Sequence, residues 1–61
     1  MTTSQLIDTI KKWTTKNPHG PTFVDLHSVF GGDADTLEEE LDKARQANMI
    51  DKDRNGDYFV I

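Results

Sequence analysis

The sequence predicts an α+β fold of three helices followed by a C-terminal β-hairpin. Apolar residues recur at helical spacing in three segments, and glycine or proline separates these segments. Near the end of the chain, Asn55-Gly56 is a strong signal for a tight hairpin turn. The 61 residues carry a net charge of -4 and include no cysteine. We therefore expect one small acidic domain, residues 1–61, held together by packing rather than by disulfides.

The first helix is expected over residues 4–16. Its apolar side chains recur at helical spacing: Leu6, Ile7, Ile10 and Trp13. Thr2 or Thr3 can cap its start, and Asn17-Pro18 enforces its end because proline disfavours helical angles in the residue before it. Since Trp13 continues the apolar stripe, we expect its indole to lie in the core.

A short strand and a second helix are expected next. Thr22-Phe23 follows the Gly20-Pro21 turn and is expected to form a short extended piece. The apolar residues Phe23, Leu26, Val29 and Phe30 then predict a short helix, which ends at Gly31-Gly32 because glycine accepts the left-handed angles of a helix C-terminus.

The third helix has the clearest start signal. Asp35 and Glu38 match a capping box, in which each residue binds the backbone N–H of the other. They precede apolar residues at helical spacing: Leu37, Leu41 and Ala44. The helix is expected to close around Asn48, which tolerates left-handed angles, so that Met49 and Ile50 fold back on its last turn.

The hairpin is expected to turn at Asn55-Gly56 in a type I′ turn, which requires positive φ at both residues. The resulting pairs are Arg54 with Asp57, Asp53 with Tyr58, Lys52 with Phe59, Asp51 with Val60 and Ile50 with Ile61. This register directs Ile50, Phe59 and Ile61 toward the helices. It directs Tyr58 and Val60 to the other face, where either the first helix or a partner covers them.

Three stretches of sequence carry a resemblance to a known superfamily. They are Thr22-Phe23-Val24-Asp25-Leu26 at the start of the second helix, Leu37-x3-Leu41-x2-Ala44 in the third, and Ala47-Asn48-Met49-Ile50 before the Asn55-Gly56 hairpin. Together with the element order, they resemble the winged helix-turn-helix superfamily over nearly the whole chain. The chain departs from it at Asn48, where many members have glycine. The resemblance implies a small winged helix domain with a short strand and a hairpin wing, and by default DNA binding through the third helix.

The outward face of the third helix opposes that default function. Helical geometry places four residues on it: Asp35, Glu39, Asp42 and Gln46. Three of these four are acidic, whereas duplex DNA presents one negative charge per about 1.7 Å of its axis. A solvated surface that maintains solubility explains the same charges, but it too is unsuited to a DNA groove. We therefore expect a non-catalytic regulator or adaptor that binds a protein partner through these four residues and Tyr58.

The alternative is a winged-helix transcriptional regulator that binds DNA as a homodimer. Its contacts to the DNA backbone would come from Lys11 and Lys12 on the first helix and from Lys52 and Arg54 beside the hairpin turn. Dimerisation would double the number of phosphate contacts, which an acidic monomer lacks.

Other chemistry is not expected. The run from Asp51 to Asp57 matches the first seven positions of an EF-hand calcium loop, but the hairpin explains the same residues. His19 and His27 have no second ligand at metal spacing, and no nucleophile, acid–base pair or phosphate-binding loop is evident. We expect no enzymatic activity, cofactor or metal. The apolar runs are too short to span a bilayer, so the expected location is cytoplasmic.

Overall fold

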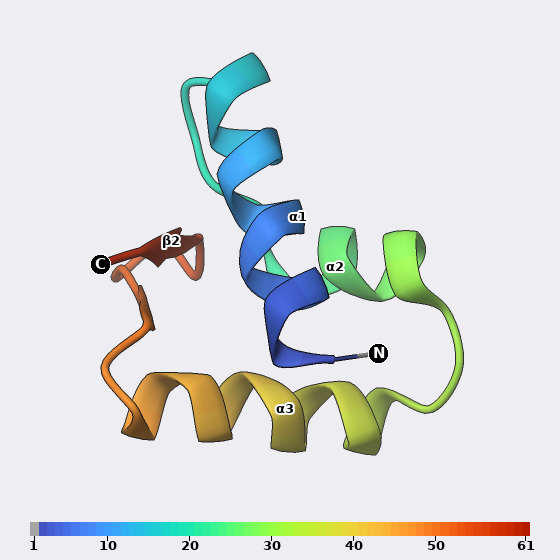
Figure 1. Ribbon diagram of the computed structural model, residues 1–61. Helices are drawn as coiled ribbons and strands as arrows, with labels where there is room; N and C mark the ends of the chain where they lie inside the picture. Colours follow the sequence, from blue (N-terminus) through green and yellow to red (C-terminus); the bar gives the residue numbers. More distant parts are fainter. Residues whose placement is uncertain (1) are drawn as a thin grey trace.

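The computed structural model describes residues 2–61, and within them it contains three helices and one two-stranded antiparallel sheet (Figure 1). The helices are α1 (Thr3–Lys16), α2 (Phe23–Phe30) and α3 (Ala34–Gln46), and the strands are β1 (Ile50–Lys52) and β2 (Tyr58–Val60). The predicted α+β class is confirmed. Over the same residues, no helix combines the length and apolarity that crossing a membrane requires.

The core lies where all five elements meet. Figure 1 shows α1 standing across α3, with α2 beside its N-terminal half and the hairpin on its other side. The buried side chains are Leu6, Ile10, Leu26, Leu37, Leu41, Ala44, Ile50 and Tyr58. The prediction that Trp13 belongs to this core is wrong. The C-terminal half of α1 projects beyond the other helices (Figure 1), so the indole is only half-buried.

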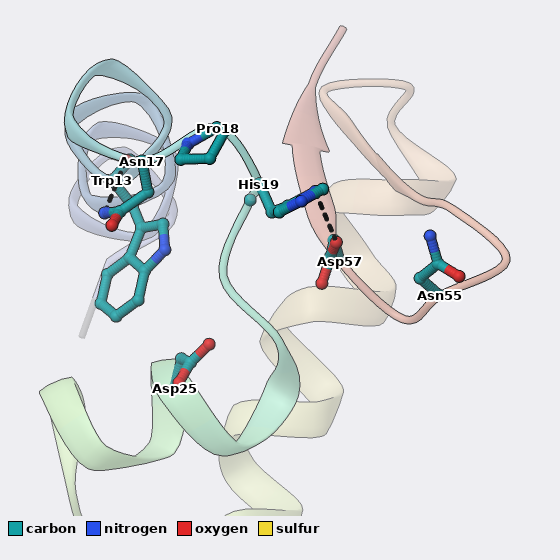
Figure 2. Close-up of a pocket in the computed structure, with 8 residues that line it drawn as sticks. Trp13, Asn17, Pro18, His19, Asp25, Asn55 and Asp57 are labelled. Atoms are coloured by element: carbon teal, nitrogen blue, oxygen red, sulfur yellow. Dashed lines mark hydrogen bonds and ion pairs between the residues drawn. The ribbon is translucent and has the colours of Figure 1, made fainter.

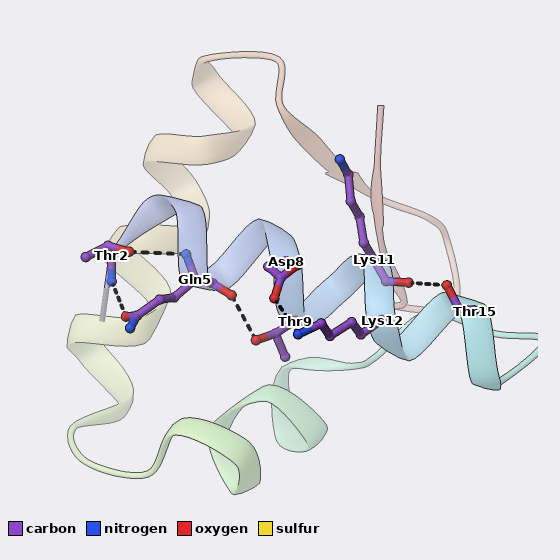
Figure 3. A network of polar contacts seen from close by, with 7 residues as sticks. All are labelled: Thr2, Gln5, Asp8, Thr9, Lys11, Lys12 and Thr15. Atoms are coloured by element: carbon purple, nitrogen blue, oxygen red, sulfur yellow. Dashed lines mark hydrogen bonds and ion pairs between the residues drawn. The ribbon is translucent and has the colours of Figure 1, made fainter.

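Helix α1 agrees with the predicted range to within one residue at its start. Thr2 is the N-cap and forms a capping box with Gln5: the Thr2 Oγ1 accepts from the Gln5 N–H at 3.1 Å, and the Gln5 Oε1 accepts from the Thr2 N–H at 2.9 Å (Figure 3). At the other end, extended Asn17 donates its N–H to the Trp13 carbonyl at 2.9 Å. Proline at the next position prevents continuation.

The predicted short strand at Thr22-Phe23 is absent from the described residues, because this segment starts α2 instead. Thr22 is the N-cap, and Phe23 is the first helical residue. The side chains of Thr22 and Asp25 each accept a hydrogen bond from the other's backbone N–H, which fixes the helix start. The segment still reaches the sheet, because the Pro21 carbonyl accepts from the Tyr58 N–H at 2.8 Å. At its far end α2 stops as predicted at Gly31, whose φ is 69°.

Helix α3 begins earlier than predicted. Its N-cap is Asp33, whose carboxylate accepts from the Asp35 N–H at 3.0 Å, so the capping box predicted at Asp35 and Glu38 is wrong. Asp33 is the first carboxylate after the glycine turn, and capping there adds two residues to the helix.

The predicted end of α3 around Asn48 is confirmed. The φ of Asn48 is 60°, and its N–H donates to the Arg45 carbonyl at 3.0 Å. The Met49 N–H donates to the Ala44 carbonyl, also at 3.0 Å. These two bonds form a Schellman motif, in which the left-handed residue turns the chain back over the last helical turn.

The predicted hairpin register is wrong by one residue. The observed pairs are Ile50 with Val60, Asp51 with Phe59 and Lys52 with Tyr58. The loop has three residues rather than two, because Asp53 closes it: its carboxylate accepts from the N–H groups of Asn55 and Asp57, and its carbonyl accepts from Gly56. Only Gly56 in this loop has positive φ, at 88°. This combination is typical of a type I turn followed by a glycine bulge.

The shifted register reverses the two faces of β2, whereas Ile50 in β1 lies inward as predicted and is 1 % exposed. Tyr58 is directed inward and is 5 % exposed, whereas Ile61, predicted to face the helices, is 69 % exposed. Phe59 is also on the outer face, opposite Asp51. The predicted outward position of Tyr58 is therefore wrong, and the chain's own core covers its ring.

The loop geometry predicts different costs for its two central residues. Gly56→Ala is expected to lower the free energy of unfolding by about 1–2 kcal/mol, because a side chain disfavours positive φ. Asn55→Ala is expected to change it by no more than about 0.5 kcal/mol, because the bond to Asp53 comes from its backbone N–H. Urea unfolding of the two variants tests this. Equal losses of stability at both positions would indicate that the loop is a type I′ turn rather than a type I turn with a glycine bulge.

Burial of Tyr58 predicts a stability loss at alkaline pH. Burial raises the pKa of its hydroxyl above 10.0, Arg45 acts in the opposite direction, and Asp42 and Glu38 raise it further. Above pH 10 the unfolded chain therefore loses this proton before the folded protein does, so stability falls as pH rises. We expect unfolding free energies measured from pH 8 to 11 to fall more steeply for the wild type than for Tyr58→Phe. Parallel curves would contradict the raised pKa of the hydroxyl.

Candidate partner-binding surface

The outer side of α3 carries four of the five predicted contact residues: Asp35, Glu39, Asp42 and Gln46. All four side chains are exposed, while Leu37, Leu41 and Ala44 on the opposite side are buried. The period of an α-helix separates the two sets, because residues three and four apart share a face. The fifth residue, Tyr58, is not part of this surface because it is buried in the core.

Most acidic groups of α3 are free of ion pairs. Lys43 lies 3.7 Å from Glu40, and Arg45 lies 3.6 Å from Asp51. Among residues 2–61, the other carboxylates of the helix and its cap form no ion pair: Asp33, Asp35, Glu38, Glu39 and Asp42. Asp33 and Asp35 lie at the N-terminal end of the helix, where the helix dipole favours negative charge, and the other three lie further along it. The surface therefore combines local stability with a negative potential that no side chain of the described residues neutralises by direct contact.

The four cations of the alternative DNA site come from two elements. Lys11 and Lys12 are exposed on α1, and the Lys12 Nζ is 2.9 Å from the Asp8 carboxylate (Figure 3). Lys52 and Arg54 are exposed on the hairpin, where the Lys52 Nζ lies 5.8 Å from the centre of the Tyr58 ring. None of the four lies on α3.

His27 and the calcium-like run have local structural roles. The His27 Nε2 lies 2.9 Å from the Gly32 carbonyl oxygen, and its ring stacks on Phe23 with centroids 6.4 Å apart. The Asp53 carboxylate is engaged by the backbone of its own turn. Over the described residues, no three histidine or acidic side chains gather where they could hold a metal ion.

A cleft that the sequence did not reveal lies between the end of α1, the following loop and the hairpin turn (Figure 2). Its volume is ≈ 440 Å³. Figure 2 shows the Trp13 indole and the Asp25 carboxylate at one end of it, and His19 and Asp57 beside the hairpin. The Nδ1 of His19 lies 3.9 Å from the Asp57 carboxylate. Residue spacing could not predict this cleft, because it forms only where Asn55 and Asp57 of the hairpin lie beside residues 13–25.

Exposed polar side chains are thus available to a ligand on the acidic side of α3 and in the open cleft beside Trp13. These two surfaces lie on different elements and share no residue. Comparison of the chain with protein-family models, with curated proteins and with solved structures gave no match, so a function for the chain rests on these two surfaces.

Proposed function

We propose that the chain is a winged-helix domain that binds a protein partner through the acidic side of α3, acting as a non-catalytic regulator or adaptor. The observation that carries this proposal is the stripe of exposed acids, Asp35, Glu39 and Asp42, none of which has an ion-pair partner within residues 2–61. The element order supports the winged-helix assignment: three helices precede the hairpin, and the Pro21 carbonyl binds the strand β2 where a short strand is expected in that fold.

The partner of such a surface carries lysine or arginine side chains. Exposed ion pairs contribute only about 0.2–1 kcal/mol each, so the acidic stripe contributes more to the association rate and to the choice of partner than to affinity. Binding is expected to weaken as salt is added, because salt screens exposed charges.

A pair of charge-matched variants tests this role. The binding variant combines Asp35→Asn, Glu39→Gln and Asp42→Asn. The control combines Asp8→Asn, Glu40→Gln and Asp51→Asn, which removes the same number of charges from acids that already have ion-pair partners. A protein captured from source-cell extract by the wild type and by the control, but not by the binding variant, would support the proposal. Equal capture by all three proteins would contradict it.

DNA binding predicts a different outcome, which a titration can detect. A mixed-sequence DNA duplex is added to isotope-labelled protein at about 50 mM salt, where phosphate contacts are strong. The proposal expects the amide signals of α3 and of the hairpin to remain unchanged. Salt-reversible shifts at Lys52, Arg54 and α3 would overturn the proposal in favour of a DNA-binding regulator.

A further inference from the structure

We propose that the cleft beside Trp13 is a second binding site, which accepts the guanidinium group of an arginine side chain from a partner chain. The site lies apart from α3, so it does not depend on the function proposed above. The ligand class follows from the side chains that line the cleft and from the charges that they leave uncompensated.

The charge of the cleft is negative. Two carboxylates, Asp25 and Asp57, line it, and no lysine or arginine does. His19 is the only other titratable side chain in the lining. A cation that enters the cleft therefore meets two negative groups and no fixed positive one.

Both carboxylates have hydrogen-bonding capacity to spare. One oxygen of Asp25, Oδ2, accepts from the Thr22 N–H, and the other oxygen accepts no hydrogen bond from residues 2–61. The Asp57 side chain is only 15 % exposed, yet its carboxylate has no hydrogen-bond donor among the described residues and lies 3.9 Å from His19. Carboxylates that are largely removed from water gain most from a charged donor.

The aromatic wall favours arginine over lysine. The half-buried Trp13 indole lines the same cleft as Asp25, and Figure 2 shows both at the same end. A guanidinium is flat, so it can stack on an indole while its N–H groups bind a carboxylate in the same plane. An ammonium group is compact and strongly hydrated, and it cannot satisfy both contacts in this way.

The fluorescence of Trp13 can report ligand binding directly. Trp13 is the only tryptophan, so ligand entry is expected to change its fluorescence. The probes are N-acetyl-arginine amide, its uncharged isostere N-acetyl-citrulline amide, and N-acetyl-lysine amide. We expect the arginine probe to bind with a dissociation constant on the order of 1 mM, and the other two to bind at least about tenfold more weakly. Equal binding of the citrulline or the lysine probe would overturn the proposal.

Variants then assign the contact. Asp25→Asn keeps an oxygen that can cap α2 but removes the charge. It is expected to weaken binding of the arginine probe about tenfold. Asp42→Asn on α3 makes the same chemical change outside the cleft and is expected to leave binding unchanged. Unchanged affinity in Asp25→Asn, or equal losses in both variants, would contradict a site in the cleft.

The source of the guanidinium is tested separately. Free L-arginine also carries an α-ammonium and an α-carboxylate, whose opposite charges leave its net charge equal to that of the blocked probe, so it is expected to bind no more tightly than that probe. Tighter binding of free arginine would assign the site to a small metabolite and overturn the assignment to a partner chain. The α3 variants of the first proposal leave the cleft unchanged, so either proposal can fail without the other.

Discussion

Replacing Leu41 with alanine is expected to unfold a large fraction of the protein at room temperature. Leu41 is 1 % exposed and lies in the one core cluster, to which all five elements contribute. Removing a buried leucine side chain costs about 2–5 kcal/mol, depending on how far the cavity collapses. The core of a domain of this size rarely supplies more than about 3–5 kcal/mol of stability. Urea unfolding monitored by far-UV circular dichroism measures the loss.

An exposed residue provides the control for this loss. Val24 on α2 is 72 % exposed, so Val24→Ala removes a branched side chain without leaving a cavity. Its effect on the free energy of unfolding is expected to stay within about 0.5 kcal/mol. If Leu41→Ala were as stable as Val24→Ala, α3 would have to present a different face to α1.

The helices could be predicted because their signals are local. Thr2 and Asn17-Pro18 bound α1, Gly31 ends α2 and Asn48 ends α3, and each of these acts on backbone groups or angles within a few residues of itself. The start of α3 was misplaced because two aspartates two residues apart both suit an N-cap. The structure uses the earlier one, Asp33.

The hairpin could not be predicted to the residue, because Asp53-Arg54-Asn55-Gly56 contains two competing turn signals. Asn-Gly favours a two-residue type I′ turn, whereas aspartate first and glycine fourth favour a type I turn. In the structure the Asp53 carboxylate binds two backbone N–H groups, and the loop grows by one residue. Because side chains alternate along a strand, that single residue moves Tyr58 into the core and Ile61 out of it.

The two candidate sites also differ in whether local sequence signals predict them. The acidic side of α3 follows from the helical period, so its exposed residues could be read from the sequence. The cleft beside Trp13 depends on how far α1 projects and on where the hairpin turn docks. Both are set by tertiary packing, which leaves no periodic signal in the sequence.

Gly20→Ala is expected to separate the loop before α2 from the hairpin. A Cβ at Gly20 would overlap the backbone carbonyl of Tyr58, so one of the two segments must move. Either movement would break the 2.8 Å bond from the Tyr58 N–H to the Pro21 carbonyl and loosen the Tyr58 ring. Overpacking and one lost buried hydrogen bond together predict a cost of about 2–4 kcal/mol.

Hydrogen exchange separates this local effect from general destabilisation. The Tyr58 amide is expected to be protected in the wild type and to lose that protection first in Gly20→Ala. Gly32→Ala is the matched control, because a Cβ there meets no atom within 4 Å and the substitution costs only the strain of a φ of 72°, about 1–2 kcal/mol. If Gly20→Ala were no more costly than this control and left the Tyr58 amide protected, β2 would not be held against the loop by Pro21, and the hairpin would depend on the core alone.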